Sequence, residues 1–292
     1  MHVIAGATGR VGGATARALL GQGAEIRVLV RRAADAEDWR GRGAEAHIVD
    51  LVDRDALDSA LRGCAGFFVL LPFDPSVDDL DAHADALIAS IAGAVADQRV
   101  PHVVALSSGG ADLPTGTGPI AGLHRLERAL RSTGSIITAL RPGHFQEKVA
   151  DVIDTARTAG VFPVLAPTAD APVPMVAAAD VGPIAARSLL DPPAVSETVD
   201  IVGPSWSERD VAALLGAALG KELHVEVIDE AAWLAALEDG GLPPHAARSL
   251  VELHHADAQG LLAPRGDRRV HASTGMAATI EQLLLGAEAP RP

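Results

Sequence analysis

A glycine-rich turn near the start of the chain constrains the fold more than any other feature. The run Gly6-Ala7-Thr8-Gly9-Arg10-Val11-Gly12 follows the apolar segment 2–5 and leads into segment 11–20, where small and apolar residues recur at helical spacing. Glycine tolerates the left-handed backbone of a tight turn and lets backbone N–H groups approach a pyrophosphate. The following helix would direct its positive end at that charge. The order of strand, glycine turn and helix therefore predicts a nucleotide-phosphate site.

Strands and helices alternate from this turn to about residue 150. The segment 66–71 is apolar throughout, as a strand covered on both faces should be. Strands joined in this way by helices form a doubly wound parallel sheet of the Rossmann type, in which ligands bind beyond the carboxyl ends of the strands. We predict strands at 2–5, 25–30, 45–49, 66–71, 102–106 and 136–140, and helices at 11–20, 53–61, 77–98 and 120–131.

The pattern loosens after Phe145. We predict an NAD(P)-binding Rossmann domain over 1–150 and a smaller C-terminal α+β substrate lobe over 151–292, parts of which can return to the sheet. Asp180 is a candidate cap for a helix at 178–190, and Ser207 heads the next helix with Asp210 three residues later. The remaining predictions are helices at 148–159, 229–238, 243–257 and 274–285, a proline-rich loop at 161–174, a strand at 198–202 and an edge strand at 223–228.

Composition excludes several classes of function. The 292 residues are 48% hydrophobic and carry a net charge of −14, so we expect no direct attraction to nucleic acid or to an anionic membrane. No apolar stretch reaches the ~20 residues of a membrane helix, and the first predicted strand begins at residue 2, so we expect no signal peptide. The single cysteine, Cys64, fits a reducing compartment. We predict a cytoplasmic protein that is a monomer or a homodimer.

Two arginines stand where a dinucleotide fold reads the adenosine ribose. Arg31 and Arg32 follow the second predicted strand, at a place where an acidic residue would accept hydrogen bonds from the ribose hydroxyls. Guanidinium groups pair well with phosphate, so we predict that the cofactor is NADP(H) in preference to NAD(H). The alternative is a solvated surface pair. Asp50, after the third strand, could bind the adenine amino group or cap the helix that begins near Arg54.

The order of these motifs resembles the NmrA-like family of atypical short-chain dehydrogenases/reductases. The resemblance rests on the glycine run, on Leu-Val-Arg-Arg, on Ser107-Ser108 and on Glu127 ahead of Arg141-Pro142-Gly143-His144-Phe145. It continues in Val173-Pro174-Met175-Val176, Asp180-Val181-Gly182 and Val202-Gly203-Pro204. The resemblance implies an NADP-type Rossmann domain, a small substrate lobe and reduction of quinones, enones, imines or related compounds, although some members are redox-sensing regulators.

The chain departs from the wider superfamily in its catalytic pair. A Tyr-x-x-x-Lys dyad normally supplies the proton, but this chain contains no tyrosine and its matching helix has no lysine. We predict His124 and Ser107 as catalytic residues, because histidine titrates near neutral pH and Ser107 follows a strand. The alternatives are a histidine on a polar helix face and a serine that shapes the turn before Gly109.

The remaining predictions complete the site. Histidine and aspartate at 254 and 257 share one helix face, which gives at most two ligands, so we expect no metal site. The predicted function is NADPH-dependent reduction of a small, largely apolar carbonyl, quinone or enone-type compound. The alternatives are a redox sensor with little turnover and a non-redox isomerase or cyclase. Cofactor contacts are predicted at Gly6, Thr8, Gly9, Arg10, Val11, Gly12, Arg31, Arg32, Asp50, Leu71, Pro72 and Ser107, and substrate contacts at Phe73, Ser108, His144 and Phe145.

Overall fold

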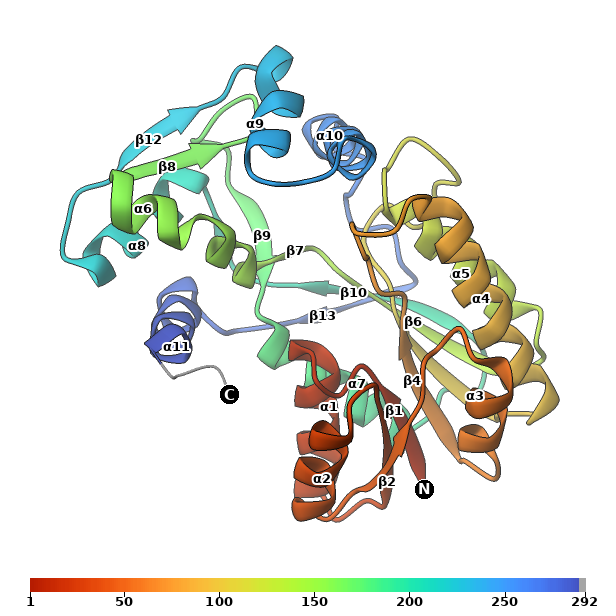
Figure 1. Ribbon diagram of the computed structural model, residues 1–292. Helices are drawn as coiled ribbons and strands as arrows, with labels where there is room; N and C mark the ends of the chain where they lie inside the picture. The colour runs from red at the N-terminus through yellow and green to blue at the C-terminus, as the bar shows by residue number, and fades with distance from the viewer. Residues whose placement is uncertain (289–292) are drawn as a thin grey trace.

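A parallel eight-stranded sheet forms the centre of the computed structural model, which describes residues 1–288 (Figure 1). The strand order is β13-β10-β6-β5-β4-β1-β2-β3, and every neighbouring pair is parallel. The order reverses direction between β1 and β4, which is the topological switch point of a doubly wound fold. The strands are β1 (His2–Ala5), β2 (Ile26–Val30), β3 (Glu45–Ile48), β4 (Gly66–Leu70), β5 (His102–Leu106), β6 (Ile136–Pro142), β10 (Glu197–Val202) and β13 (Arg268–His271).

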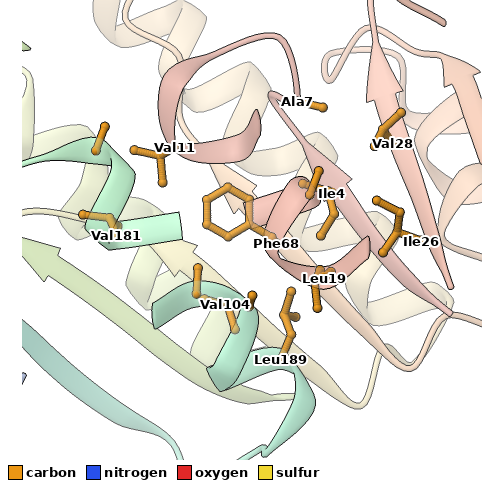
Figure 2. Packing of buried hydrophobic residues seen from close by; sticks show 14 of the residues in the cluster. Ile4, Ala7, Val11, Leu19, Ile26, Val28, Phe68, Val104, Val181 and Leu189 are labelled. Atoms are coloured by element: carbon orange, nitrogen blue, oxygen red, sulfur yellow. The ribbon is translucent and has the colours of Figure 1, made fainter. Parts of the chain in front are cut away.

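Two layers of helices cover the sheet. Successive strand residues point to opposite faces, so Ile4 and Phe68 join one buried cluster while Val3 and Phe67 join the other. Figure 2 shows Phe68 surrounded by apolar side chains of the first cluster. On that face lie α1 (Arg10–Gly21), α2 (Ala33–Gly41) and α7 (Ala178–Leu190), and on the other lie α3 (Arg54–Leu61), α4 (Leu80–Asp97) and α5 (Ile120–Arg131).

A smaller body with its own core follows the sixth strand. Its buried residues include Val149, Phe162, Leu215 and Ile280, which come from segments far apart in the sequence. Residues 289–292 of the predicted lobe lie outside the described residues. Its strands are β7 (His144–Phe145), β8 (Val161–Val164), β9 (Val173–Val176), β11 (Ser205–Trp206) and β12 (His224–Val227). Its helices are η1 (Gln146–Val152), α6 (Ile153–Ala159), α8 (Glu208–Leu219), η2 (Glu230–Ala232), α9 (Trp233–Asp239), α10 (Pro244–Ala258) and α11 (Met276–Glu288).

Three elements of the C-terminal half return to the large sheet. Strand β10 pairs with β6 and β13 pairs with β10, while α7 packs against α1. The approach of these helices is close, because a Cβ atom at Gly182 would overlap Ala14. The sheet that carries the glycine turn is therefore completed by residues well beyond 150. Among the described residues, none of the helices is both long enough and apolar enough to cross a membrane.

The structure corrects the prediction that 161–174 is a loop. Strand β8 pairs in parallel with β12, and β9 pairs with β7 and β11. Pro163 lies in β8, which pairs only with β12 in the part of the chain that the structure describes, and an edge strand tolerates the loss of a backbone donor. Pro174 of β9 lies opposite Ser205 of β11 and precedes the two residues of β9 that pair with β7. The helix predicted at 148–159 begins as the 3₁₀ turn η1 and becomes α-helical at Ile153.

The structure confirms one predicted helix cap, Ser207. It does not confirm the candidate cap Asp180, and it excludes the capping alternative for Asp50. Ser207 forms the capping box with Asp210 that its spacing predicts. Asp180 does not cap α7, because its carboxylate accepts hydrogen bonds from the backbone of Ser273 and Thr274, while Glu147 Oε1 accepts the N–H of Ala178. Helix α3 is capped by the residue at 53 instead of the one at 50.

Candidate cofactor and substrate site

The glycine turn after β1 has the geometry that a diphosphate requires. Gly6 has a φ of 65°, and a Cβ atom there would lie 2.6 Å from Leu70 Cδ2. Gly9 is the N-cap of α1, and within the described structure no side chain caps this helix and no acidic residue stands in its first turn. The first backbone N–H groups of α1 and its positive end are therefore free to meet an anion. The residues of this turn fit the pyrophosphate of a dinucleotide.

Gly12 allows the helix to approach the turn. A Cβ atom at this position would overlap the carbonyl oxygen of Gly6 and lie 2.8 Å from that of Ala5. Val11, also in the predicted motif, is buried in the core, whereas Thr8 and Arg10 are exposed beside the turn. The motif therefore combines packing residues with residues that a ligand can reach.

A cavity of about 240 Å³ opens beside this turn, towards α2. It brings Arg32 together with Arg17 and Arg42, two basic residues that the sequence analysis did not select. Arg17 follows Gly13 by four residues, so helical spacing from the turn could have indicated it. The cavity is lined by Ala7, Thr8, Arg17, Arg32, Asp35, Asp38, Trp39 and Arg42.

One of the two arginines predicted to bind the 2′-phosphate, Arg32, is paired with a carboxylate. Both are exposed, and Arg32 donates two hydrogen bonds of 2.8 Å to the carboxylate of Asp35. This hydrogen-bonded pair raises the pKa of Arg32 and lowers that of Asp35. A 2′-phosphate would therefore compete with Asp35 for Arg32. Asp50 is also exposed, and its Oδ1 accepts the N–H of Val52 in a local turn.

A second cavity, of about 700 Å³, lies beside the loop that follows β4. Leu71, Pro72 and Phe73 line it, and Phe73 is 42% exposed. The opposite walls come from the beginnings of α4 and α5 and from α10. The other three predicted substrate residues, at 108, 144 and 145, do not line this cavity. The four predicted substrate contacts therefore do not all line one cavity.

Ser107 belongs to a buried ionic network at the ends of β5 and β6. Its hydroxyl donates to Glu127 Oε1 at 2.6 Å, and Arg141 donates to both oxygens of Glu127 at 2.9 and 2.7 Å. The side chains of Arg141 and Glu127 are only 8% and 6% exposed. Burial opposes the charge of Arg141, but the bonds to Glu127 prevail and raise its pKa. The network fixes Ser107 and commits its proton to Glu127.

His124 lies on the first turns of α5 and is half-buried. Its Nδ1 is 2.9 Å from the carbonyl oxygen of Ala111, which can only accept a hydrogen bond. Nδ1 therefore carries a proton, and Nε2 is the nitrogen left for other partners. Ser108, whose side chain is half-buried, follows Ser107 in the loop between β5 and α5.

His144 and Phe145 form the short strand β7 and lie on its two faces. Phe145 packs against the core cluster that includes Val11 of the glycine turn. His144 Nε2 is 3.0 Å from Oδ1 of Asp257 on α10. Burial alone would raise the pKa of Asp257, but the hydrogen bond and charge of His144 and the nearby cations lower it. The Asp257 partner was not recognised from sequence, where it was considered only as a metal ligand.

Comparisons with known proteins agree with this architecture. A solved NADPH-dependent quinone oxidoreductase from Escherichia coli, in complex with NADPH, superposes with a TM-score of 0.75 at 24% identity, covering 97% of this chain and all of that one. The chain is 28% identical over 257 residues to an NAD(P)H azoreductase of Xenophilus azovorans, covering 87% of this chain and 86% of the relative.

A third relative has a higher sequence identity. The chain is 33% identical over 254 residues to a (4-alkanoyl-5-oxo-2,5-dihydrofuran-3-yl)methyl phosphate reductase of Streptomyces griseus subsp. griseus, and the match covers 86% of this chain and 85% of the relative. Residues 2–260 match the NmrA-like family as a whole. The chain therefore belongs to the NmrA-like family, as its motifs predict.

Proposed function

We propose that this chain is an NADPH-dependent oxidoreductase that reduces a small, largely apolar acceptor such as a quinone, an enone or an azo compound. The observation that carries the proposal is the glycine turn, which presents the uncapped N-terminus of α1 at the switch point of the sheet. The relatives support the reaction class, since they are named as a quinone oxidoreductase, an azoreductase and a (4-alkanoyl-5-oxo-2,5-dihydrofuran-3-yl)methyl phosphate reductase.

The chain offers separate contacts for each part of the cofactor. Gly6, Gly9 and Gly12 would hold the pyrophosphate, with Thr8 and Arg10 at its exposed side. The remaining predicted contacts are Arg31 and Arg32 for the 2′-phosphate, Asp50 for the adenine, and Leu71, Pro72 and Ser107 along the nicotinamide half. When bound, NADPH supplies a hydride, and the protein contributes orientation and an apolar surrounding.

The substrate would lie between the carboxyl ends of β4 to β6 and the smaller lobe. We propose that residues 1–150 hold the cofactor and that residues 151–292 close over the acceptor. Phe73, Ser108, His144 and Phe145 are the proposed substrate contacts, with His124 and Ser107 as the predicted catalytic residues. We further propose a monomer or homodimer that acts in the cytoplasm without binding nucleic acid or membranes, consistent with the charge of −14 and the buried Cys64.

The test measures binding and turnover separately. Calorimetric titration should show tighter binding of NADPH than of NADH, and oxidation of NADPH should accelerate when menadione or methyl red is added. Equal affinity for both cofactors would contradict the arginine assignment. Tight binding of NADPH without reduction of either acceptor would contradict the oxidoreductase and favour a sensor.

A further inference from the structure

His144 and Asp257 form a hydrogen-bonded pair that joins strand β7 to helix α10. The two residues are 113 positions apart in the chain, and their side chains are 25% and 30% exposed. They are thus partly enclosed and still within reach of a small molecule. Because Nε2 is the nitrogen that meets the carboxylate, Nε2 carries the proton of the neutral ring. Nδ1 is then the nitrogen that can exchange a proton with a ligand.

The position of this pair relates it to the nicotinamide half of a dinucleotide. In a doubly wound sheet the second nucleotide lies across the carboxyl ends of the strands beyond the switch point, which are β4, β5 and β6 here. His144 stands two residues after the end of β6. The loop after β5 is adjacent, because the N–H of Gly109 donates to the carbonyl oxygen of Pro142 at 3.3 Å.

Helix α10 and the segment after it are packed tightly onto this region. A Cβ atom at Gly118 would overlap the carbonyl oxygen of Ser249, and one at Gly109 would overlap that of Leu262. These two close contacts lie on either side of Asp257 in the sequence, so they fix the distance between α10 and the carboxyl ends of the strands. The carboxylate of Asp257 therefore holds the imidazole in a defined orientation.

Three charged or titratable groups lie near the pair of His144 and Asp257. Lys148 of η1, Glu208 of α8 and His254 of α10 interact with this pair, and His255 interacts with His254. Burial lowers the pKa of His254 to about 4, so its ring stays neutral near pH 7. Burial also raises the pKa of Glu208. Asp257 is thus the group in direct contact that stabilises a positive charge on His144.

The other candidate donors are less suited to this work. The proton of Ser107 is committed to Glu127, which is itself held twice by Arg141. His124 donates through Nδ1 to a backbone carbonyl, and no carboxylate of residues 1–285 is hydrogen-bonded to its ring. A carboxylate partner stabilises the imidazolium that a general acid requires.

We infer that His144, positioned by Asp257, is the proton donor for reduction of an acceptor with a basic reduced form, such as an azo compound. The inference rests on the proposed function. After hydride transfer to one nitrogen of the azo bond, the electron pair of that bond moves to the second nitrogen, which takes the proton from Nδ1 of the His144 imidazolium. His144 remains as a neutral ring with Nε2–H donated to Asp257, and water restores the proton.

The experiment compares two acceptors in His144→Gln. The azo nitrogen left by hydride transfer is strongly basic and needs an acid, whereas hydride transfer to a quinone leaves a phenolate, a much weaker base that can take its proton from water later. Methyl red reduction should fall by about 100-fold or more, menadione reduction by less than about 10-fold, and NADPH affinity should not change. His224→Gln, at an exposed histidine on β12, is the matched control and should retain both rates within about threefold, as a residue outside proton transfer would.

Asp257 is tested through the pH profile and through spectra of the free protein. Asp257→Asn should move the alkaline limb of methyl red reduction to lower pH, because the imidazolium loses its anionic partner, and Asp257→Glu should restore it in part. Independently, ¹⁵N spectra of labelled histidine should show the neutral ring of His144 protonated on Nε2.

Each alternative outcome decides the question. Equal losses for both acceptors in His144→Gln, an unmoved alkaline limb in Asp257→Asn or a neutral His144 protonated on Nδ1 would overturn the assignment. Reduction of menadione but not methyl red by the wild type would also overturn it while leaving the proposed function intact. Reduction of neither acceptor would overturn both.

Discussion

A Cβ atom at Gly12 would overlap the backbone carbonyl oxygen of Gly6. Helix α1 can begin where it does because position 12 has no side chain, and the position of its first N–H groups depends on this contact. We expect Gly12→Ala to lower NADPH affinity by at least about tenfold, because the helix must move away from the phosphate. Calorimetric titration measures the change.

Gly21 is the matched control, since it belongs to the same helix and a Cβ atom there meets nothing within 4 Å. Gly21→Ala should leave NADPH affinity unchanged. Wild-type affinity in Gly12→Ala would show that the close contact does not position the phosphate site.

The pair between Arg32 and Asp35 predicts opposite effects on cofactor choice. Arg32→Ala should lower the affinity for NADPH by about tenfold and leave the affinity for NADH nearly unchanged, since only NADPH carries the additional phosphate. Asp35→Asn should raise the affinity for NADPH, because the Arg32 guanidinium loses the carboxylate that competes with the 2′-phosphate. Affinities for both cofactors test this, with the exposed Arg62→Ala as control. Parallel losses of NADPH and NADH affinity in Arg32→Ala would contradict the assignment.

Glu127 is expected to be required for stability, since it partners both Arg141 and Ser107 in the core. Glu127→Ala removes both hydrogen-bonded carboxylate oxygens from the buried guanidinium of Arg141 and leaves it with Asp112, 3.9 Å away, so it should lower the free energy of unfolding by about 3 kcal/mol or more. Urea denaturation measures the loss. Arg128→Ala, at an exposed position on the same helix, should change stability by less than about 0.5 kcal/mol. A loss below about 1 kcal/mol in Glu127→Ala would contradict the role of the network.

One buried histidine, His102, and one half-buried histidine, His254, predict acid sensitivity. Burial lowers the pKa of His102 and of His254 from 6.5 to about 4 in the folded chain. Between these values the unfolded chain binds more protons, so stability should fall as the pH falls from about 7 to 4, by up to about 3 kcal/mol for each residue. Denaturation over this pH range should show that the free energy of unfolding depends less steeply on pH in His102→Asn and His254→Asn than in the wild type. An unchanged pH dependence in both variants would contradict the prediction.

Local patterns predicted the six strands up to residue 140 and the helices between them except α2. The glycine turn is recognisable from its composition, and most of these strands are short apolar runs bounded by helical spacing or turn residues. Strand β3, which contains Glu45 and His47, was indicated by its distance from the second strand. The same locality explains the capping box of Ser207, whose partner is three residues away.

Long-range pairing explains what was missed. Strand β13 has the sequence Arg-Arg-Val-His, which carries no strand pattern and is a strand only because β10 lies beside it. The cap of α7 comes from Glu147, 31 residues earlier, and not from the nearby Asp180. The same limit applies to the site, because no spacing rule connects His144 with a carboxylate 113 residues later.

The pairing of β6 with β10 has a consequence for synthesis of the chain. Strand β6 is complete at Pro142, but its outer hydrogen-bonding partner begins only at Glu197. While a ribosome translates the intervening residues, one side of β6 has no neighbour and presents open backbone donors and acceptors. Nascent chains halted before Glu197 should therefore engage chaperones, and release should coincide with the emergence of β10.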